Sequence, residues 1–463
     1  MPKLMRCEYC GLLQDEPKGV KTCSRCGGTL CYEARPPRSE AEYLAAQMEL
    51  DQVAAPAGQN VERYLLVTIR TPKEVPPQEK PLAAQSRPPV NFIAVLDVSG
   101  SMWGEKIEQA RQAVKHAVQY LRSGDVFSLV TFSSGVACPF EPTPVNDKAR
   151  KAIEDCLQTI SAGGMTALDG GLETGIQKAL EHVLESNLVL LLSDGQTNIG
   201  ELDLEVIGVR ALKARQKGML VSALGIGLDY NEALLAEIAS QGGGRFYHLE
   251  HPNQIPAYVA GELKEVAALA ARDVQIHLNV PQGATLVPLS ATFPVRQEEE
   301  QASVAVGDIP CETELEIPLR LALVGQSSGS KLSVEGELTF RSPAGNELAV
   351  RLNRVTVRFL EAGKFSLREG VVTPVVERVL EQMRAVNVLG IARLMAREPA
   401  KVAERGVEYQ RAVHRYASLL GDERAEVESQ KIRQYFMDMQ QGPASAKSAV
   451  ANAFTHLRRG KKH

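Results

Sequence analysis

The chain has 463 residues, 44% of them hydrophobic and 23% charged, so length and composition predict about three globular domains with apolar cores. The formal net charge of −4 gives no reason to expect that the chain as a whole binds nucleic acid. No secretion signal follows Met1, and no uncharged apolar stretch approaches roughly 18 residues, so we expect a cytoplasmic protein without a membrane span.

Residues 1–35 are rich in cysteine and predict a zinc ribbon. Two Cys-x-x-Cys turns are separated by 12 residues, which is typical of a tetrahedral Zn²⁺ site with Cys7, Cys10, Cys23 and Cys26 as ligands. A segment this short needs the metal to fold. Closed four-cysteine sites are usually structural, so we favour a scaffold for protein contact over a nucleic-acid reader, and we expect Cys31 to be an inert spare thiol.

Residues 36–90 connect the ribbon to the next domain. The sequence predicts a helix over 39–54 with Ser39 as its N-cap, because most residues there favour helices. Residues 61–70 alternate in hydrophobicity and predict a strand. A proline-rich linker follows over about 72–89.

Residues 91–270 predict an α/β domain, because short apolar runs alternate with helical patterns. The runs are those of strands buried on both faces, at Phe92–Leu96, Val126–Phe132, Leu188–Leu192 and Met219–Leu224. Helices are expected after the first run, around Ile107 to Leu121, and at about 147–158, 170–185, 202–217 and 231–240. This alternation predicts a parallel, doubly wound, Rossmann-like sheet with right-handed crossovers.

Oxygen-bearing side chains follow the predicted strands of this domain. Asp97, Ser99 and Ser101 come directly after the first strand, Thr166 lies in a glycine-rich loop, and Asp194 follows the strand at Leu188–Leu192. Ligands collect at the carboxyl ends of parallel strands. Carboxylate and hydroxyl oxygens are hard ligands that suit Mg²⁺ or Mn²⁺ better than zinc. We therefore predict a divalent-metal site made by these five residues.

These five positions resemble the metal-ion-dependent adhesion site of von Willebrand factor type A domains, over about 180 residues. The runs at 225–230 and 242–244 are similar to those of bacterial members. The resemblance implies that Ser99 and Ser101 bind the ion directly and that Asp97 and Thr166 or Asp194 act partly through water. It also implies that one coordination position is left for water or for a Glu or Asp of a partner protein.

The remainder of the chain predicts two further regions and a tail. The hydrophobicity of residues 271–362 alternates with a period of two, which predicts an antiparallel β-sandwich. We expect strand 61–70 to pair into this sandwich, so that the α/β domain is inserted between the two parts. Residues 368–442 predict a helical domain of three amphipathic segments. Residues 443–463 hold five Lys or Arg and no acid, and predict a flexible basic tail.

We interpret the chain as a metal-dependent scaffold for protein–protein contact and not as an enzyme. By analogy alone, similar bacterial proteins work beside MoxR-type AAA ATPases, and the sandwich and helices resemble the layout of inter-alpha-trypsin inhibitor heavy chains. One alternative is a nucleic-acid-associated factor that uses the ribbon and basic tail under control of the α/β domain. A Mg²⁺-dependent hydrolase is disfavoured, because no general base stands out in the sequence.

Overall fold

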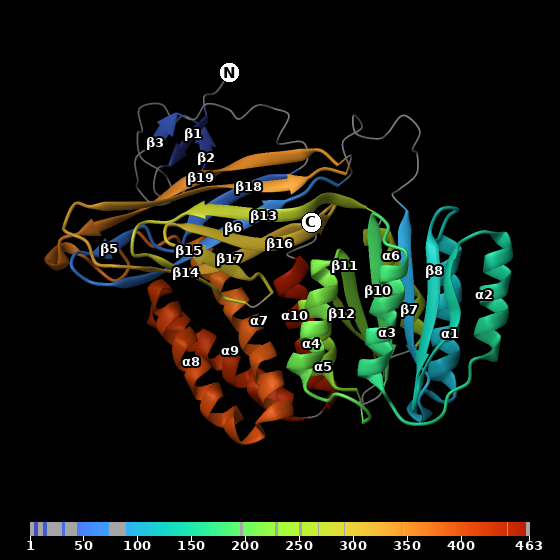
Figure 1. Ribbon diagram of the computed structural model, residues 1–463. Helices are drawn as coiled ribbons and strands as arrows, with labels where there is room; N and C mark the ends of the chain where they lie inside the picture. The colour runs from blue at the N-terminus through green and yellow to red at the C-terminus, as the bar shows by residue number, and fades with distance from the viewer. Residues whose placement is uncertain are drawn as a thin grey trace.

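The computed structural model describes residues 4–7, 13–15, 30–32, 44–73, 89–194, 198–226, 230–249, 252–266, 268–290, 292–343, 345–441 and 443–459. Figure 1 shows a β-sandwich across the top, an α/β domain at the right and a group of C-terminal helices at the lower left. A separate antiparallel sheet at the N-terminus has the order β2-β1-β3 and consists of β1 (Leu4–Cys7), β2 (Leu13–Asp15) and β3 (Leu30–Tyr32). Cys10, Cys23 and Cys26 of the predicted zinc site lie outside the described residues.

The α/β domain is built on a six-stranded sheet of order β12-β11-β10-β7-β8-β9. Its strands are β7 (Val90–Asp97), β8 (Val126–Phe132), β9 (Val136–Pro144), β10 (Ser186–Ser193), β11 (Met219–Ile226) and β12 (Gly243–Leu249). All neighbours pair in parallel except β9, which lies antiparallel at one edge. The predicted doubly wound α/β fold is confirmed.

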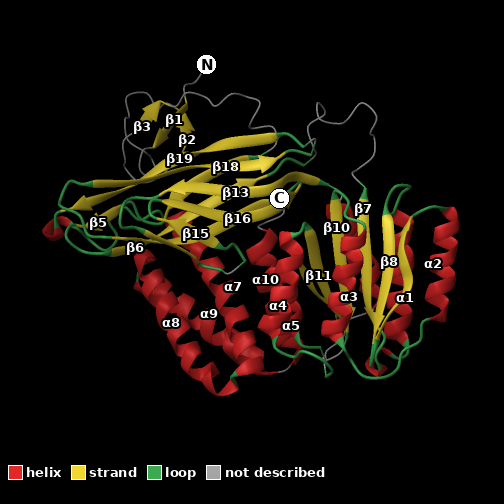
Figure 2. Cartoon of the chain, viewed as in Figure 1, coloured by secondary structure: helices red, strands yellow, loops and turns green. Residues whose placement is uncertain are grey.

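Helices cover both faces of this sheet, as Figure 2 shows. Phe92, Ala94 and Leu96 of β7 face a core shared with α1 (Glu105–Tyr120), α2 (Asp147–Thr159) and α6 (Ile255–Val266). Ile93 and Val95 face the opposite core, which is shared with α3 (Leu168–Glu181), α4 (Leu204–Gln216) and α5 (Glu232–Gln241). Burial on both faces explains why the strand reads as one continuous apolar run.

The sandwich consists of two sheets, of order β15-β16-β13-β18-β19-β5 and β14-β17-β6-β4. Its strands are β4 (Ala45–Leu50), β5 (Ala54–Pro56), β6 (Val61–Arg70), β13 (Leu269–Asn279), β14 (Thr285–Pro288), β15 (Val295–Glu298), β16 (Gln301–Pro310), β17 (Glu314–Leu323), β18 (Lys331–Arg341) and β19 (Glu347–Leu360). β6 pairs with β17 along its whole length. The α/β domain is therefore inserted between two strands of one sheet.

The helix predicted over 39–54 is wrong for its described part, where the chain forms β4 and β5. β4 pairs with β6 and buries Met48 and Leu50 in the sandwich core. The side-chain amide of Asn353 accepts from the backbone N–H of Met48 and donates to its carbonyl, both at 2.8 Å. Tertiary pairing thus overrides a local preference for helix that is weak in free energy.

Four helices follow the sandwich, namely α7 (Thr373–Arg397), α8 (Val402–Ala417), α9 (Asp422–Gln441) and α10 (Pro443–Arg459). The predicted flexible tail over 443–463 is wrong, because α10 occupies most of it. Val450, Phe454 and Leu457 of α10 are at most 3% exposed and pack into the core of the α/β domain. The apolar spacing of four and three residues is helical, and the five basic residues obscured it.

No helix among the described residues is both long enough and apolar enough to span a membrane.

Candidate metal centre

The candidate site is built where β7 leaves the sheet. β7 is buried along its length and ends at Asp97, after which the chain turns through the 3₁₀ turn η2 (Gly100–Met102). Met102 is fully buried, and its N–H donates to the carbonyl of Ser99 at 3.1 Å. This anchored turn fixes Ser99 and Ser101 at the carboxyl edge of the sheet, the edge where parallel α/β sheets bind ligands.

Four of the predicted site residues are joined by hydrogen bonds. The hydroxyl of Ser101 donates to Oδ1 of Asp194 at 2.8 Å and lies 3.0 Å from the hydroxyl of Ser99. The N–H of Ser99 donates to Oδ1 of Asp97 at 2.8 Å. Ser193, next to Asp194 on β10, donates its hydroxyl to Oδ2 of Asp97 at 2.6 Å. Residues from two strand ends therefore form one cluster of oxygen atoms.

Thr166 reaches this cluster through its loop. The loop is held against the β7 turn by the N–H of Gly100, which donates to the carbonyl of Gly164 at 3.0 Å. The amide oxygen of Asn198 accepts from the N–H of Thr166 at 2.8 Å, and the N–H of Asn198 donates back to the carbonyl of Thr166 at 3.1 Å. These contacts fix the backbone of Thr166 between the loops that carry Ser101 and Asp194.

The cluster is buried on all sides but one. Asp97, Ser99, Thr166 and Asp194 are at most 4% exposed, whereas Ser101 is exposed. Burial raises the pKa of Asp97, hydrogen bonds from Ser193 and Ser99 oppose that rise, and the nearby Asp194 adds to it. A buried pair of carboxylates calls for a positive charge, and solvent reaches the cluster at Ser101.

That positive charge is supplied by Lys106 of α1. Its ammonium forms an ion pair with Oδ2 of Asp194, whose side chain is fully buried, while the side chain of Lys106 is 25% exposed. Lysine in the first turn of a helix is unfavourable, because the N-terminus of a helix carries partial positive charge. Asp194 compensates for that cost, and a cation therefore already lies on the carboxylate of the cluster.

The donor set fits an oxygen-seeking divalent cation. Ser99, Ser101 and Asp194 present three oxygens linked in a row, with Asp97 bonded to Ser99, and the loop that carries Thr166 is held against the same turn. No three His, Cys, Asp or Glu side chains come together as a metal site anywhere in the described residues. The five predicted residues include no His or Cys, and their hydroxyls and two carboxylates suit Mg²⁺ or Mn²⁺.

Sequence reasoning missed Ser193, Lys106 and Asn198. Lys106 could have been found, because a lysine in the first helical turn after a strand-end aspartate signals a nearby acid. Ser193 directly precedes a predicted ligand, but strand alternation would have pointed it away from Asp194. Asn198 gave no local signal, because its role depends on a contact with a loop 32 residues earlier in the chain.

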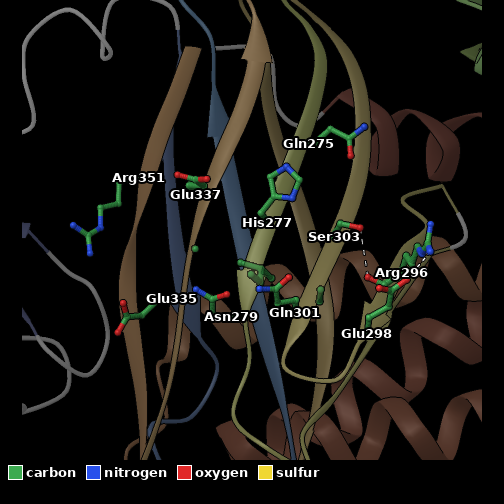
Figure 3. A pocket seen from close by; sticks show the side chains of 13 residues that line it. Gln275, His277, Asn279, Arg296, Glu298, Gln301, Ser303, Glu335, Glu337 and Arg351 are labelled. Carbon is green, nitrogen blue, oxygen red and sulfur yellow. Dashed lines mark hydrogen bonds and ion pairs between the residues drawn. The ribbon is translucent and has the colours of Figure 1, made fainter. Parts of the chain in front are cut away.

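A second hollow lies on the sandwich, away from this site (Figure 3). This groove of about 880 Å³ is lined by Gln275, His277 and Asn279 of β13 and by polar residues of β15, β16, β18 and β19. Residues 274, 276 and 278, which alternate with these three, are buried in the sandwich core. The groove is thus the solvent-facing side of one sheet, and no cluster of chemically reactive groups converges in it.

Comparison with known proteins identifies the α/β domain. Residues 91–260 match the family model of the von Willebrand factor type A domain. The uncharacterised protein YfbK of Escherichia coli is 26% identical over 302 residues, which cover 63% of this chain and 50% of that protein. Inter-alpha-trypsin inhibitor heavy chain H3 of Mesocricetus auratus is 27% identical over 47% of this chain and 25% of its own length. The chain thus spans half or less of these two relatives.

A solved structure extends the similarity of fold beyond this domain. A von Willebrand factor type A protein from Catenulispora acidiphila superposes with a TM-score of 0.62 at 17% identity, covering 91% of this chain and 98% of that one. At this identity the likeness shows the fold alone. Its coverage means that the α/β domain and most of the surrounding structure share one arrangement in both proteins.

Proposed function

From the von Willebrand factor type A domain at residues 91–260, we propose that this chain is a metal-dependent protein-binding module. Ser99 and Ser101 would hold Mg²⁺ or Mn²⁺ directly, with Asp97, Thr166 and Asp194 completing the site partly through water. A Glu or Asp of a partner protein would take the open position. We propose a cytoplasmic location, which the free thiols of Cys138 and Cys156 support.

The observation that carries this proposal is the linked row of oxygens at Ser99, Ser101 and Asp194, open to solvent at Ser101. A bound divalent cation would supply a concentrated positive charge that attracts one further carboxylate. The protein's own residues then do the positioning. Asp97 fixes the N–H of Ser99, Ser193 fixes Asp97, and Lys106 neutralises Asp194 until a metal replaces it.

We propose binding and not catalysis, because both carboxylates of the site are already engaged. Asp97 accepts hydrogen bonds from Ser99 and Ser193, and Asp194 accepts from Ser101 and pairs with Lys106. A general base needs a basic atom that faces the substrate. Neither carboxylate offers such an atom in this arrangement.

One of the five basic residues on which the nucleic-acid alternative relies is buried and paired. Lys447, one of the five basic residues of the expected tail, is 3% exposed in α10 and lies 3.0 Å from Oε2 of Glu232. It also donates to the carbonyl of Tyr230.

The zinc ribbon remains a proposal. Elemental analysis of anaerobically purified protein should find one zinc per chain, and this zinc should be lost in Cys10→Ser but not in Cys31→Ser.

The proposal is tested by partner capture from native lysate on the full chain. Capture should occur with Mg²⁺, be lost with EDTA and return when Mg²⁺ is restored. The partner should lose binding when one of its own Glu or Asp residues is replaced. Capture that ignores EDTA would contradict metal-dependent docking.

A further inference from the structure

Large apolar side chains are exposed on the loops that carry the candidate metal site. Trp103 is 79% exposed and lies two residues after Ser101. Met165 is 49% exposed and directly precedes Thr166, and Leu202 is 56% exposed in the loop that follows Asp194. Each of the three loops that carry the site thus presents one large apolar side chain to solvent.

Hydrogen bonds hold these three loops together. The N–H of Gly100 in the first loop donates to the carbonyl of Gly164 in the second at 3.0 Å. The N–H groups of Asn198 and Ile199 in the third loop donate to the carbonyl of Thr166 at 3.1 and 3.3 Å. Single exposed apolar residues are ordinary, but several on converging loops mark an interaction surface.

The apolar surface continues along α4. Val206 and Val209 are 44% and 46% exposed, and their spacing of three residues places them on one side of the helix, which begins two residues after Leu202. The opposite side of α4 buries Ile207 and Ala211 in the core. A surface helix normally has one apolar stripe. Val206 and Val209 give this helix a second apolar patch, which follows the loop that carries Asp194.

The charges around the site favour a single acidic group. A divalent cation would balance Asp97 and Asp194, and Lys106 would leave one positive charge for an incoming carboxylate. Glu105 is exposed in the first turn of α1, whereas the carboxylate of Glu108 in the same turn is paired with Arg111. A run of acidic residues would meet the Glu105 carboxylate and be repelled.

We infer that the partner segment carries one Glu or Asp flanked by large apolar side chains. This inference rests on the proposed metal-dependent docking. The carboxylate faces the metal at Ser101, one flank packs on Trp103 and Met165, and the other packs along Leu202, Val206 and Val209. Aromatic anchors in such positions supply most of the affinity of many interfaces, and the charge supplies orientation.

The test is selection of a random-sequence displayed peptide library on the full chain in Mg²⁺, with elution by EDTA. Selected peptides should share one acidic residue with enriched apolar residues on both sides. Trp103→Ser and Leu202→Ser should each weaken a selected peptide about tenfold or more, because truncating a central anchor has effects of that size. Val324→Ser is the matched control, since Val324 is 47% exposed on the sandwich and should leave binding unchanged.

The outcomes separate the inference from the function on which it rests. Acidic peptides without apolar enrichment, or binding that is unchanged in both loop variants, would overturn the inference and leave metal docking intact. If no peptide is released by EDTA while Mg²⁺ still binds, metal docking itself fails and the inference fails with it. Mg²⁺-dependent self-association that is lost in Trp103→Ser would identify a second copy as the occupant and also overturn it.

Discussion

Two buried clusters in different parts of this molecule each place a cation beside a carboxylate. Asp97 and Asp194 are fully buried at the edge of the α/β domain, and Asp51 is 2% exposed where the sandwich meets the C-terminal helices. The cation beside Asp51 is Arg63, which is itself 7% exposed and donates to the backbone carbonyls of Glu62 and Ala54. The cation beside Asp194 is Lys106, whose side chain is 25% exposed.

The difference between the clusters lies in whether the cation can leave. Arg63 is buried, and two of its guanidinium nitrogens donate to backbone carbonyls, so we interpret the Asp51 cluster as closed and structural. Lys106 reaches Asp194 on a flexible four-carbon stem from the surface, and its loss can be compensated by water or a metal ion. A buried carboxylate is therefore not by itself evidence of a binding site, whereas one with an exchangeable cation is a candidate.

The largest expected effect is on Mg²⁺ affinity, which should fall on mutation of one cluster and not of the other. Asp97→Ala should reduce Mg²⁺ affinity by more than about 100-fold, because losing even an outer supporting partner of a metal site typically costs 10- to 100-fold. Asp51→Asn should bind Mg²⁺ as the wild type does. Isothermal titration calorimetry on the full chain measures both, and equal loss in the two variants would remove the distinction.

The Asp51 cluster should instead make the free energy of unfolding depend on pH. Burial raises the pKa of Asp51 to about 6, opposed by Arg63 and by the hydroxyl of Tyr416. The pKa is higher in the folded chain than the ordinary value of about 4, so Asp51 binds its proton more tightly in the folded state. The resulting contribution to the free energy of unfolding is fully present below about pH 4 and is lost as pH rises through about 6. The step should approach 3 kcal/mol in order of magnitude.

Asp51→Asn should remove this step, since the amide cannot ionise. Urea unfolding between pH 4 and 8 measures the free energy of unfolding for both proteins. Retention of the same slope by the variant would assign the pH dependence to other groups.

An intermediate effect should come from the exchangeable cation. Lys106→Met should raise Mg²⁺ affinity about tenfold, because the ammonium no longer competes for Asp194 and one repelling charge is gone. Lys115→Met is the matched control, because Lys115 lies on the same helix and pairs with Glu154, away from the site. Calorimetry giving weaker binding in Lys106→Met would mean that Lys106 supports the metal form and does not compete with it.

The smallest effect is expected at Thr166. Thr166→Ala should weaken metal-dependent partner capture several-fold, with a change in the free energy of unfolding within about 1 kcal/mol, because only one hydroxyl is removed. Thr159→Ala, at the end of α2, should leave capture unchanged. Capture that is insensitive to Thr166→Ala would limit the site to residues on β7 and β10.

The sequence was informative where local pattern and topology agree. The apolar run of β7 followed by Asp97, Ser99 and Ser101 placed oxygen donors at a strand end, and the sheet brings Asp194 to the same edge. The sequence pattern gave a wrong prediction where long-range packing determines the secondary structure. Residues 45–50 favour a helix locally, but pairing with β6 makes them a strand. Ser193 and Lys106 act through partners more than 85 residues away in sequence, and spacing cannot show such contacts.

Crystals of the full chain soaked in Mn²⁺ and measured for anomalous scattering would show whether the oxygen cluster binds a divalent cation. We expect a single peak in the α/β domain, within coordination distance of the hydroxyls of Ser99 and Ser101, with the ammonium of Lys106 moved away from Asp194. No peak in that domain, with Lys106 still paired to Asp194 at millimolar Mn²⁺, would contradict it.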